Sequence, residues 1–172
     1  YNDKNTAKNS TTLFALGAGS SALDLDRVMV LTTASSCSSS ELVINSLAPF
    51  VEVVQIGAAT CGKPVGQQPA LIGDYVLFAI NFQTVNALDQ GEYFDGLLPR
   101  CAVADNISGD WGVASDPLYA EAVSFIANGT CSTTASSASA MAIASPMSNA
   151  AVSAVVARKP ILAAPWLLNN EQ

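Results

Sequence analysis

The hydrophobic pattern is clearest over residues 27–56, where two apolar segments flank a segment with helical spacing. Residues 27–33, RVMVLTT, are β-branched and almost continuously apolar, which is typical of a strand buried on both faces. Residues 41–50, ELVINSLAPF, repeat apolar positions at helical spacing, and Pro49 marks the end of that helix. A second apolar strand follows at residues 51–56. This order predicts a right-handed βαβ unit with parallel strands.

The rest of the chain has more turn-forming residues and two clear elements. Residues 57–70 contain several glycines and prolines and predict a loop. Residues 74–84 alternate in part and predict a long strand, whereas residues 86–116 predict structured loops. Residues 116–128 predict a helix, with an aspartate at its capping position, a proline in its first turn and a glycine directly after it.

Both ends of the chain are biased in composition. Residues 1–22 form a polar entry segment, with one short strand expected at Thr12–Leu16. Residues 132–150 are a low-complexity stretch of Ser and Ala, which leaves open a weak helix or a surface loop. Residues 151–168 come closest to a membrane span, but charges and prolines interrupt them, so no span is expected. The chain begins at Tyr1 with no signal-peptide pattern, which predicts an excised or mature fragment.

The composition excludes several classes of protein. Half of the 172 residues are hydrophobic and 12% are charged, which argues against global disorder and suits one domain or a large piece of one. The net charge of −7 argues against a protein that binds nucleic-acid phosphates. The absence of histidine excludes catalytic systems and zinc sites that need one from this chain. The four cysteines have no metal-binding spacing, so neither a metal nor a cofactor is expected.

Two polar segments follow the two predicted parallel strands. The first is the serine-rich run 35–40 at the start of the helix. It can act as a helix cap, with Ser38 and Glu41 in a capping box. It can also carry a nucleophile on a strand-to-helix turn, where free amides and the helix dipole favour a developing oxyanion. The second segment, TCGKPVGQQ, carries Lys63 after Gly62, which is either a solvated lysine or part of a site beyond the sheet.

The two polar segments are expected to meet, because adjacent parallel strands end at the same edge of a sheet. A serine after the first strand can then approach the lysine after the second. In a chain without histidine, lysine is a candidate general base. A lysine acts as a base only when burial lowers its pKa well below the ordinary value of about 10.4.

Residues 28–67 resemble the core of the carboxy-terminal processing (tail-specific) serine peptidases. That family has a stretch of the form T-A-S-A-S-E, a helix, a strand, and then T-x-G-K followed by a glutamine. Its nucleophile is the serine three residues before the glutamate. Counting back from Glu41 gives Ser38, and Lys63 lies 25 residues after Ser38, as the family's base does. Gln67 follows four residues after the lysine, at the position of the third member of a Ser-Lys-Gln triad.

The resemblance covers roughly residues 26–131 and implies a serine endopeptidase with a Ser-Lys dyad. Ser38 would attack a peptide carbonyl and Lys63 would take the proton and return it to the leaving amine. Gln67 would orient the lysine, although Gln68 could take this role after a shift of one residue.

The same resemblance implies the fold and the supporting residues. The backbone amide of Ser39 would contribute to an oxyanion hole, and Glu41 and Gly62 would support the site. The implied fold is α/β, a ClpP/crotonase-like ββα spiral core with parallel strands. Residues 1–172 would hold the C-terminal half of such a catalytic domain, without the family's upstream half and PDZ domain.

The cysteines are expected to form two disulfides. Cys37 and Cys61 stand beside the two implied catalytic positions, at the ends of neighbouring strands, and are expected to pair. Cys101 and Cys131 would close a second loop, worth roughly 3–4 kcal/mol in the chain-entropy model. Two disulfides imply an oxidising compartment, such as the periplasm or another extracytoplasmic part of the bacterial envelope. Four buried thiols, or Cys37 as a redox-sensitive switch on the nucleophile, are the alternatives.

The function that the sequence favours is therefore a serine-type peptidase that acts on proteins or peptides. The competing hypotheses are a non-catalytic peptide-binding module or inactive fragment, and an esterase that uses the same dyad. No nucleic-acid partner is expected, and a homo-oligomer is left open.

Overall fold

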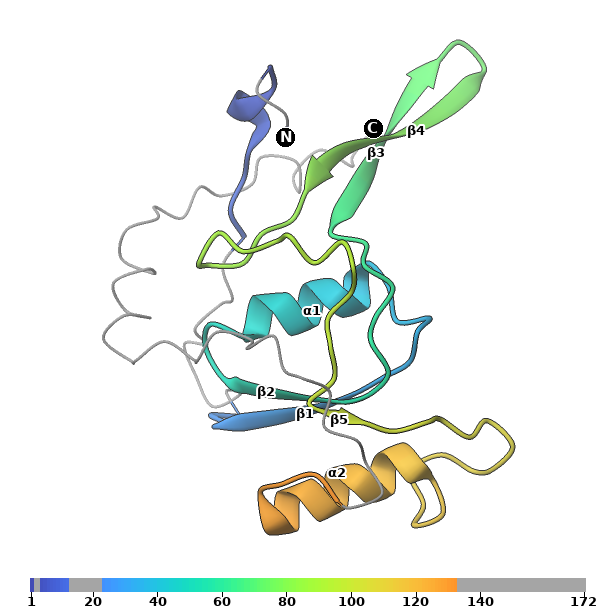
Figure 1. Ribbon diagram of the computed structural model, residues 1–172. Helices are drawn as coiled ribbons and strands as arrows, with labels where there is room; N and C mark the ends of the chain where they lie inside the picture. The colour runs from blue at the N-terminus through green and yellow to red at the C-terminus, as the bar shows by residue number, and fades with distance from the viewer. Residues whose placement is uncertain (2–3, 13–22, 133–172) are drawn as a thin grey trace.

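Three parallel strands form the central sheet of the protein (Figure 1). The computed structural model describes residues 1, 4–12 and 23–132. The strands are β1 (Arg27–Thr32), β2 (Glu52–Gly57) and β5 (Cys101–Ala102), in the order β1-β2-β5. Both pairings are parallel, so the predicted parallel strand–helix–strand unit is confirmed.

Two helices cover opposite faces of this sheet (Figure 1). Helix α1 (Ser39–Leu47) connects β1 to β2, and it ends before Pro49 as predicted. Helix α2 (Pro117–Asn128) lies on the other face, so the body has three layers. The protein is thus a mixed α/β fold with parallel strands.

The alternation of side chains along β2 builds the core on both faces of the sheet. Val53 packs with Ile44 of α1, whereas Val54 packs with Phe125 of α2. Ile44, Val54 and Phe125 are at most 1% exposed. Strand β1 was predicted to be buried on both faces, but it lies at the edge of the described sheet and its Leu31 is 41% exposed. The buried strand is β2, because it has a neighbour on each side.

A long antiparallel hairpin projects from the body on the side of α1 (Figure 1). It consists of β3 (Val65–Ile72) and β4 (Tyr75–Gln83), with an irregularity in the pairing between Gly66 and Gln67. The predicted strand at 74–84 is confirmed, but the predicted loop at 57–70 is wrong in its second half. Pro69 lies inside β3, and proline is tolerated there because β3 has a strand on only one side within the described chain.

Local chemistry fixes both ends of α2 as predicted. The carboxylate of Asp116 accepts hydrogen bonds from the amides of Leu118 and Tyr119, at 3.0 and 3.3 Å. The pKa of Asp116 lies below its usual value, chiefly because the Gly112 amide also donates to it. Gly129 follows the helix with φ 73°, a left-handed conformation that glycine adopts without strain.

A disulfide between Cys101 and Cys131 joins β5 to the segment after α2, as predicted. The remaining described element is a short 3-10 helix, η1 (Thr6–Lys8). The expected strand at Thr12–Leu16 and the Ser/Ala-rich stretch 132–150 lie, except for their first residues, outside the described residues. Across the described ranges, no helix has the length and apolar character needed to cross a membrane.

Candidate functional site

Ser38 occupies a strained turn between β1 and α1. It directly precedes the first residue of the helix, and its backbone has φ 55° and ψ −107°. Two aspartates, Asp24 and Asp89, also have positive φ, but aspartate adopts such angles in turns more readily than serine does. A non-glycine residue held in this region costs about 1–3 kcal/mol and persists only where its surroundings fix it. The structure therefore has to hold Ser38 in place, and a buried carboxylate does so.

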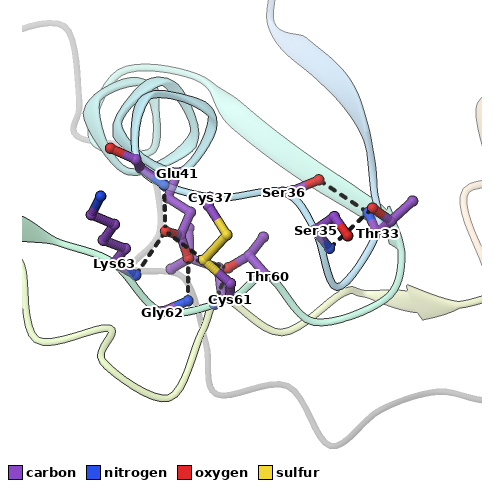
Figure 2. The surroundings of a disulfide bond; sticks show 11 residues. Thr33, Ser35, Ser36, Cys37, Glu41, Thr60, Cys61, Gly62 and Lys63 are labelled. Atoms are coloured by element: carbon purple, nitrogen blue, oxygen red, sulfur yellow. Dashed lines mark hydrogen bonds between the residues drawn. A yellow bond between two sulfur atoms is a disulfide. The ribbon is translucent and has the colours of Figure 1, made fainter.

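The carboxylate of Glu41 joins the helix start to the loop after β2. Its Oε2 accepts the amides of Ser38 and Lys63, at 2.9 and 2.8 Å. Its Oε1 accepts the Gly62 amide at 2.7 Å and the Thr60 hydroxyl at 2.6 Å. We call this set, Glu41 with Ser38, Thr60, Gly62 and Lys63, the Glu41 junction. Figure 2 shows the carboxylate between the helix and the loop.

The donors of the Glu41 junction keep a fully buried carboxylate ionised. Glu41 is 0% exposed, and burial by itself raises the pKa of a carboxyl group. The Thr60 hydroxyl and the amides of Lys63, Gly62 and Ser38 outweigh this effect, so the pKa of Glu41 lies below its usual value. Glu41 is therefore a negatively charged structural centre at neutral pH.

A second set of contacts joins the same two segments. The Cys61 amide donates to the Ser36 carbonyl at 3.0 Å, and a disulfide links Cys37 to Cys61, as predicted (Figure 2). The Cys61 Sγ lies 3.9 Å from Oε2 of Glu41, a contact rather than a hydrogen bond because the disulfide sulfur carries no hydrogen. The residue before Ser38 is thus covalently tied to a residue two positions before Lys63.

The loop that carries Lys63 also packs closely against the segment that contains Phe94 and Leu97. The Thr60 hydroxyl, which donates to Glu41, also accepts the Leu97 amide at 2.7 Å. A Cβ at Gly62 would lie 2.0 Å from the carbonyl oxygen of Phe94, so only glycine fits there, and its φ of 80° agrees. The loop that carries Lys63 is therefore held on both sides.

The predicted catalytic residues are brought together in part. The backbones of Ser38 and Lys63 meet at one carboxylate oxygen, but no hydrogen bond joins their side chains in the described chain. Ser38 is half-buried, whereas Lys63 is exposed. The burial that the sequence argument requires of a lysine base is thus not present among the described residues.

Gln67 does not reach Lys63. It is exposed on β3, where its Nε2 donates to the Phe78 carbonyl at 3.2 Å. Gln68 is exposed as well, and its backbone amide donates to the side-chain oxygen of Asn81 at 3.1 Å. Both candidates for the third member belong to the hairpin rather than to the Glu41 junction.

The Ser39 amide is the oxyanion donor that the sequence predicts. Ser39 is the first residue of α1, and the first turn of a helix leaves its amides without helical acceptors. Within the described ranges, this amide donates to no protein group. It is available to a bound anion next to Ser38.

One cluster of potential metal ligands occurs in the described part of the chain, and it includes none of the Glu41 junction residues. It contains Cys101, Glu121 and Cys131. The two sulfurs are joined in a disulfide, and the Glu121 carboxylate accepts the amide and hydroxyl of Ser132. These bonds explain the cluster as structural.

Sequence reasoning missed Thr60. It is 5% exposed and donates the shortest hydrogen bond to Glu41. The first letter of the T-x-G-K stretch is this threonine, so the signal was present in the motif, but its role depends on a contact with a residue 19 positions earlier.

A solved structure resembles the chain over much of its length. It is the "Putative S41 protease" of Bacteroides fragilis NCTC 9343, with a TM-score of 0.57 and 27% sequence identity. The match covers 63% of this chain and 29% of that one, so the chain spans less than a third of that protein's length. No protein-family model and no curated protein matches the chain.

Proposed function

We propose that the chain carries part of the catalytic domain of a serine endopeptidase of the tail-specific type, with Ser38 as nucleophile and Lys63 as base. The described sheet and helices would belong to a ββα spiral core of the ClpP/crotonase type. The substrates are proteins or peptides.

In the proposed reaction, the Ser38 hydroxyl attacks the peptide carbonyl while neutral Lys63 takes its proton. The oxygen that becomes negative is stabilised by the Ser39 amide and the start of α1. Lys63 then returns the proton to the leaving amine. In the second half of the reaction Lys63 takes a proton from water, which attacks the acyl carbon. The bond to the Ser38 oxygen breaks, that oxygen regains the proton from Lys63, and the carboxylic acid product leaves. Gln67 orients Lys63 once the hairpin brings it within reach.

The observation that carries this proposal is the backbone of Ser38, with φ 55° on a strand-to-helix turn. The expected capping box of Ser38 and Glu41 is present, but capping alone does not require this strain, since caps ordinarily have extended backbones. A strained strand-to-helix turn that presents a serine is the arrangement known as a nucleophile elbow. The Glu41 junction then places the Lys63 backbone beside this serine.

The proposal requires Lys63 to become less exposed than it is in the described residues. Bound substrate or further parts of the domain would cover the lysine. The two disulfides support an extracytoplasmic location, because such bonds persist in oxidising compartments.

The test is covalent labelling by phenylmethanesulfonyl fluoride, followed by mass spectrometry and measured against pH. We expect the label on Ser38, at a rate that rises with pH as the general base loses its proton. Lys63→Ala should reduce the rate at least about 100-fold. Lys8→Ala, which removes another exposed lysine, should leave it unchanged.

The controls separate the competing functions. Ser40→Ala should keep the label, whereas Ser38→Ala should abolish it. Absence of labelling at every pH in the folded chain would contradict a dyad assembled within these residues. Hydrolysis of a small activated ester without cleavage of any peptide would favour the esterase.

A further inference from the structure

We propose that the Cys37–Cys61 disulfide is a thiol-exchange site for a dithiol reductant, and that its reduction slows the chemistry of Ser38. The effect on rate rests on the proposed function, whereas the exchange and its effect on the loop do not. Nothing in the peptidase reaction itself requires this disulfide.

The two disulfides differ in their access to solvent. Cys61 is exposed and Cys37 is half-buried, so a thiolate can approach the first disulfide at Cys61. In the second disulfide, Cys101 is 0% exposed and packs in the core with Val54 and Phe125, whereas Cys131 is half-buried, as Cys37 is. Cys61 is therefore the one exposed partner among the four cysteines, all of which the structure describes. Since exchange requires a thiolate to reach a sulfur, a reductant should react with the Cys37–Cys61 disulfide first.

The exchange has a preferred direction. A thiolate of the reductant attacks the Cys61 sulfur, forms a mixed disulfide, and releases Cys37 as a thiolate, which takes a proton from water. The second thiol of the reductant, as its thiolate, then attacks the mixed disulfide and releases Cys61. Two electrons pass to the protein, and the reductant leaves as its own disulfide. Cys37 is the better leaving group, because it lies just before the start of α1, where the helix dipole stabilises a thiolate.

Reduction removes the covalent tie next to the strained residue. Cys37 directly precedes Ser38, and Cys61 directly precedes Gly62, whose amide donates to Glu41. Ser38 keeps its positive φ only while its neighbours hold it there. After reduction, the hydrogen bonds of the Glu41 junction are the main restraint that remains.

We therefore expect a partial loss of order rather than unfolding. The amides of Ser38, Gly62 and Lys63 should exchange their hydrogens faster after reduction. The labelling rate of Ser38 should fall about tenfold, because a smaller fraction of molecules would present the serine in the strained turn. Reoxidation should restore both values.

The first experiment titrates the 172-residue chain with dithiothreitol, alkylates the free thiols and maps them by mass spectrometry. We expect alkylation of Cys37 and Cys61 at reductant concentrations that leave Cys101 and Cys131 paired. Simultaneous reduction of both disulfides, or earlier reduction of the second, would overturn the assignment of the exchange site.

The second experiment measures the selectively reduced chain by amide hydrogen exchange and by sulfonyl fluoride labelling. The amide of Leu118, held by Asp116 at the start of α2, is the internal reference and should not change. The variant with Cys37→Ala and Cys61→Ala should give the same amide exchange and labelling rate as the reduced chain. Neither value should change when the reductant is added. Circular dichroism should show that it folds.

The outcomes separate this inference from the proposed function. Unchanged exchange of the junction amides in the reduced chain would overturn the coupling, whatever the labelling shows. Faster amide exchange without labelling in either redox state would support the coupling and contradict a Ser38–Lys63 dyad assembled within these residues. Labelling that is equal or faster after reduction would overturn the effect on Ser38.

Discussion

The Glu41 junction and the β3–β4 hairpin are adjacent in sequence, but the first is centred on a buried group whereas the second is largely exposed. Glu41 is fully buried, and each of its two carboxylate oxygens accepts two hydrogen bonds. The hairpin begins two residues after Lys63, yet most of its side chains are exposed. Its apolar side chains are exposed too, for example Leu71 at 81% and Tyr75 at 80%.

The difference shows which part of the proposed machinery is organised within the described residues. Ser38 and the Lys63 backbone are positioned by bonds to one buried group. Gln67 belongs to the hairpin, so its position relative to Lys63 depends on how the hairpin is oriented. A preorganised nucleophile and a more loosely placed third member are therefore expected.

Glu41→Gln should break the junction and have the largest effect. Glutamine keeps the shape, but it loses the charge and directs an NH₂ group at donors. We expect the free energy of unfolding to fall by about 3 kcal/mol and Ser38 labelling to fall at least about 100-fold. Urea denaturation and the sulfonyl fluoride assay measure these changes.

The matched control is Glu52→Gln. Glu52 forms an ion pair with Arg27 in which both side chains are partly exposed, so its removal should cost about 0–1 kcal/mol. Equal losses in the two variants would mean that the junction contributes no more than a surface pair.

A comparison of Gly62→Ala with Gly73→Ala tests the difference between the Glu41 junction and the hairpin. Both glycines have positive φ, 80° and 59°, but a Cβ at Gly73 meets nothing within 4 Å, whereas one at Gly62 collides with Phe94. We expect losses of unfolding free energy of about 1 kcal/mol at Gly73 and about 3 kcal/mol at Gly62.

Urea denaturation measures both variants. A loss at Gly62 no larger than at Gly73 would show that the Lys63 loop is not held against Phe94 in solution.

Acid should weaken the junction before it affects the hairpin. The pKa of Glu41 is lower in the folded chain than its usual value near 4.5, because its donors outweigh its burial. Its contribution to stability is therefore present above that value and is lost as the pH falls through the lower folded value. Unfolding free energies measured between pH 7 and pH 3 should fall less steeply in Glu41→Gln than in the wild-type chain.

Asp116→Asn is the control for the pH experiment, because the pKa of Asp116 is also lowered but its bonds lie at α2. This substitution should remove the part of the pH dependence of the unfolding free energy that comes from Asp116, and leave the part that comes from Glu41. Identical wild-type and Glu41→Gln profiles below pH 4.5 would contradict an ionised Glu41.

Phe78→Ser on the hairpin should have the smallest effect. Phe78 is 58% exposed, so we expect a change of about 0.5 kcal/mol or less in the free energy of unfolding. Ile44→Ala, at a core residue that is 1% exposed, should cost about 2–5 kcal/mol. A loss at Phe78 that approaches the one at Ile44 would show that the hairpin is covered in solution.

Elements with local signals were predictable from the sequence. The limits of α2 follow from Asp116 and Gly129, which act on the residues next to them. The parallel β1–β2 pair follows from two apolar segments around a helical one. The likeness to the solved "Putative S41 protease" agrees in part with the resemblance that the Ser38, Glu41 and Lys63 spacing suggested.

The rest depends on contacts that local patterns do not encode. Strand β3 contains polar residues and Pro69, so it has the composition of a loop and becomes a strand only by pairing with β4. The exposure of β1 depends on the order of strands in the sheet. The role of Thr60 depends on which side chain lies opposite its hydroxyl.

The Cys101–Cys131 disulfide also determines the path of mechanical tension through the chain. A force applied beyond Ser132 reaches Cys131 and passes directly to Cys101 in β5, which pairs with β2. Helix α2 lies inside the closed loop and outside this load path, so pulling leaves its length unchanged while the disulfide is intact. A tether at the C-terminal end would therefore pull on the sheet, and reduction would add the residues between the two cysteines to the extensible length.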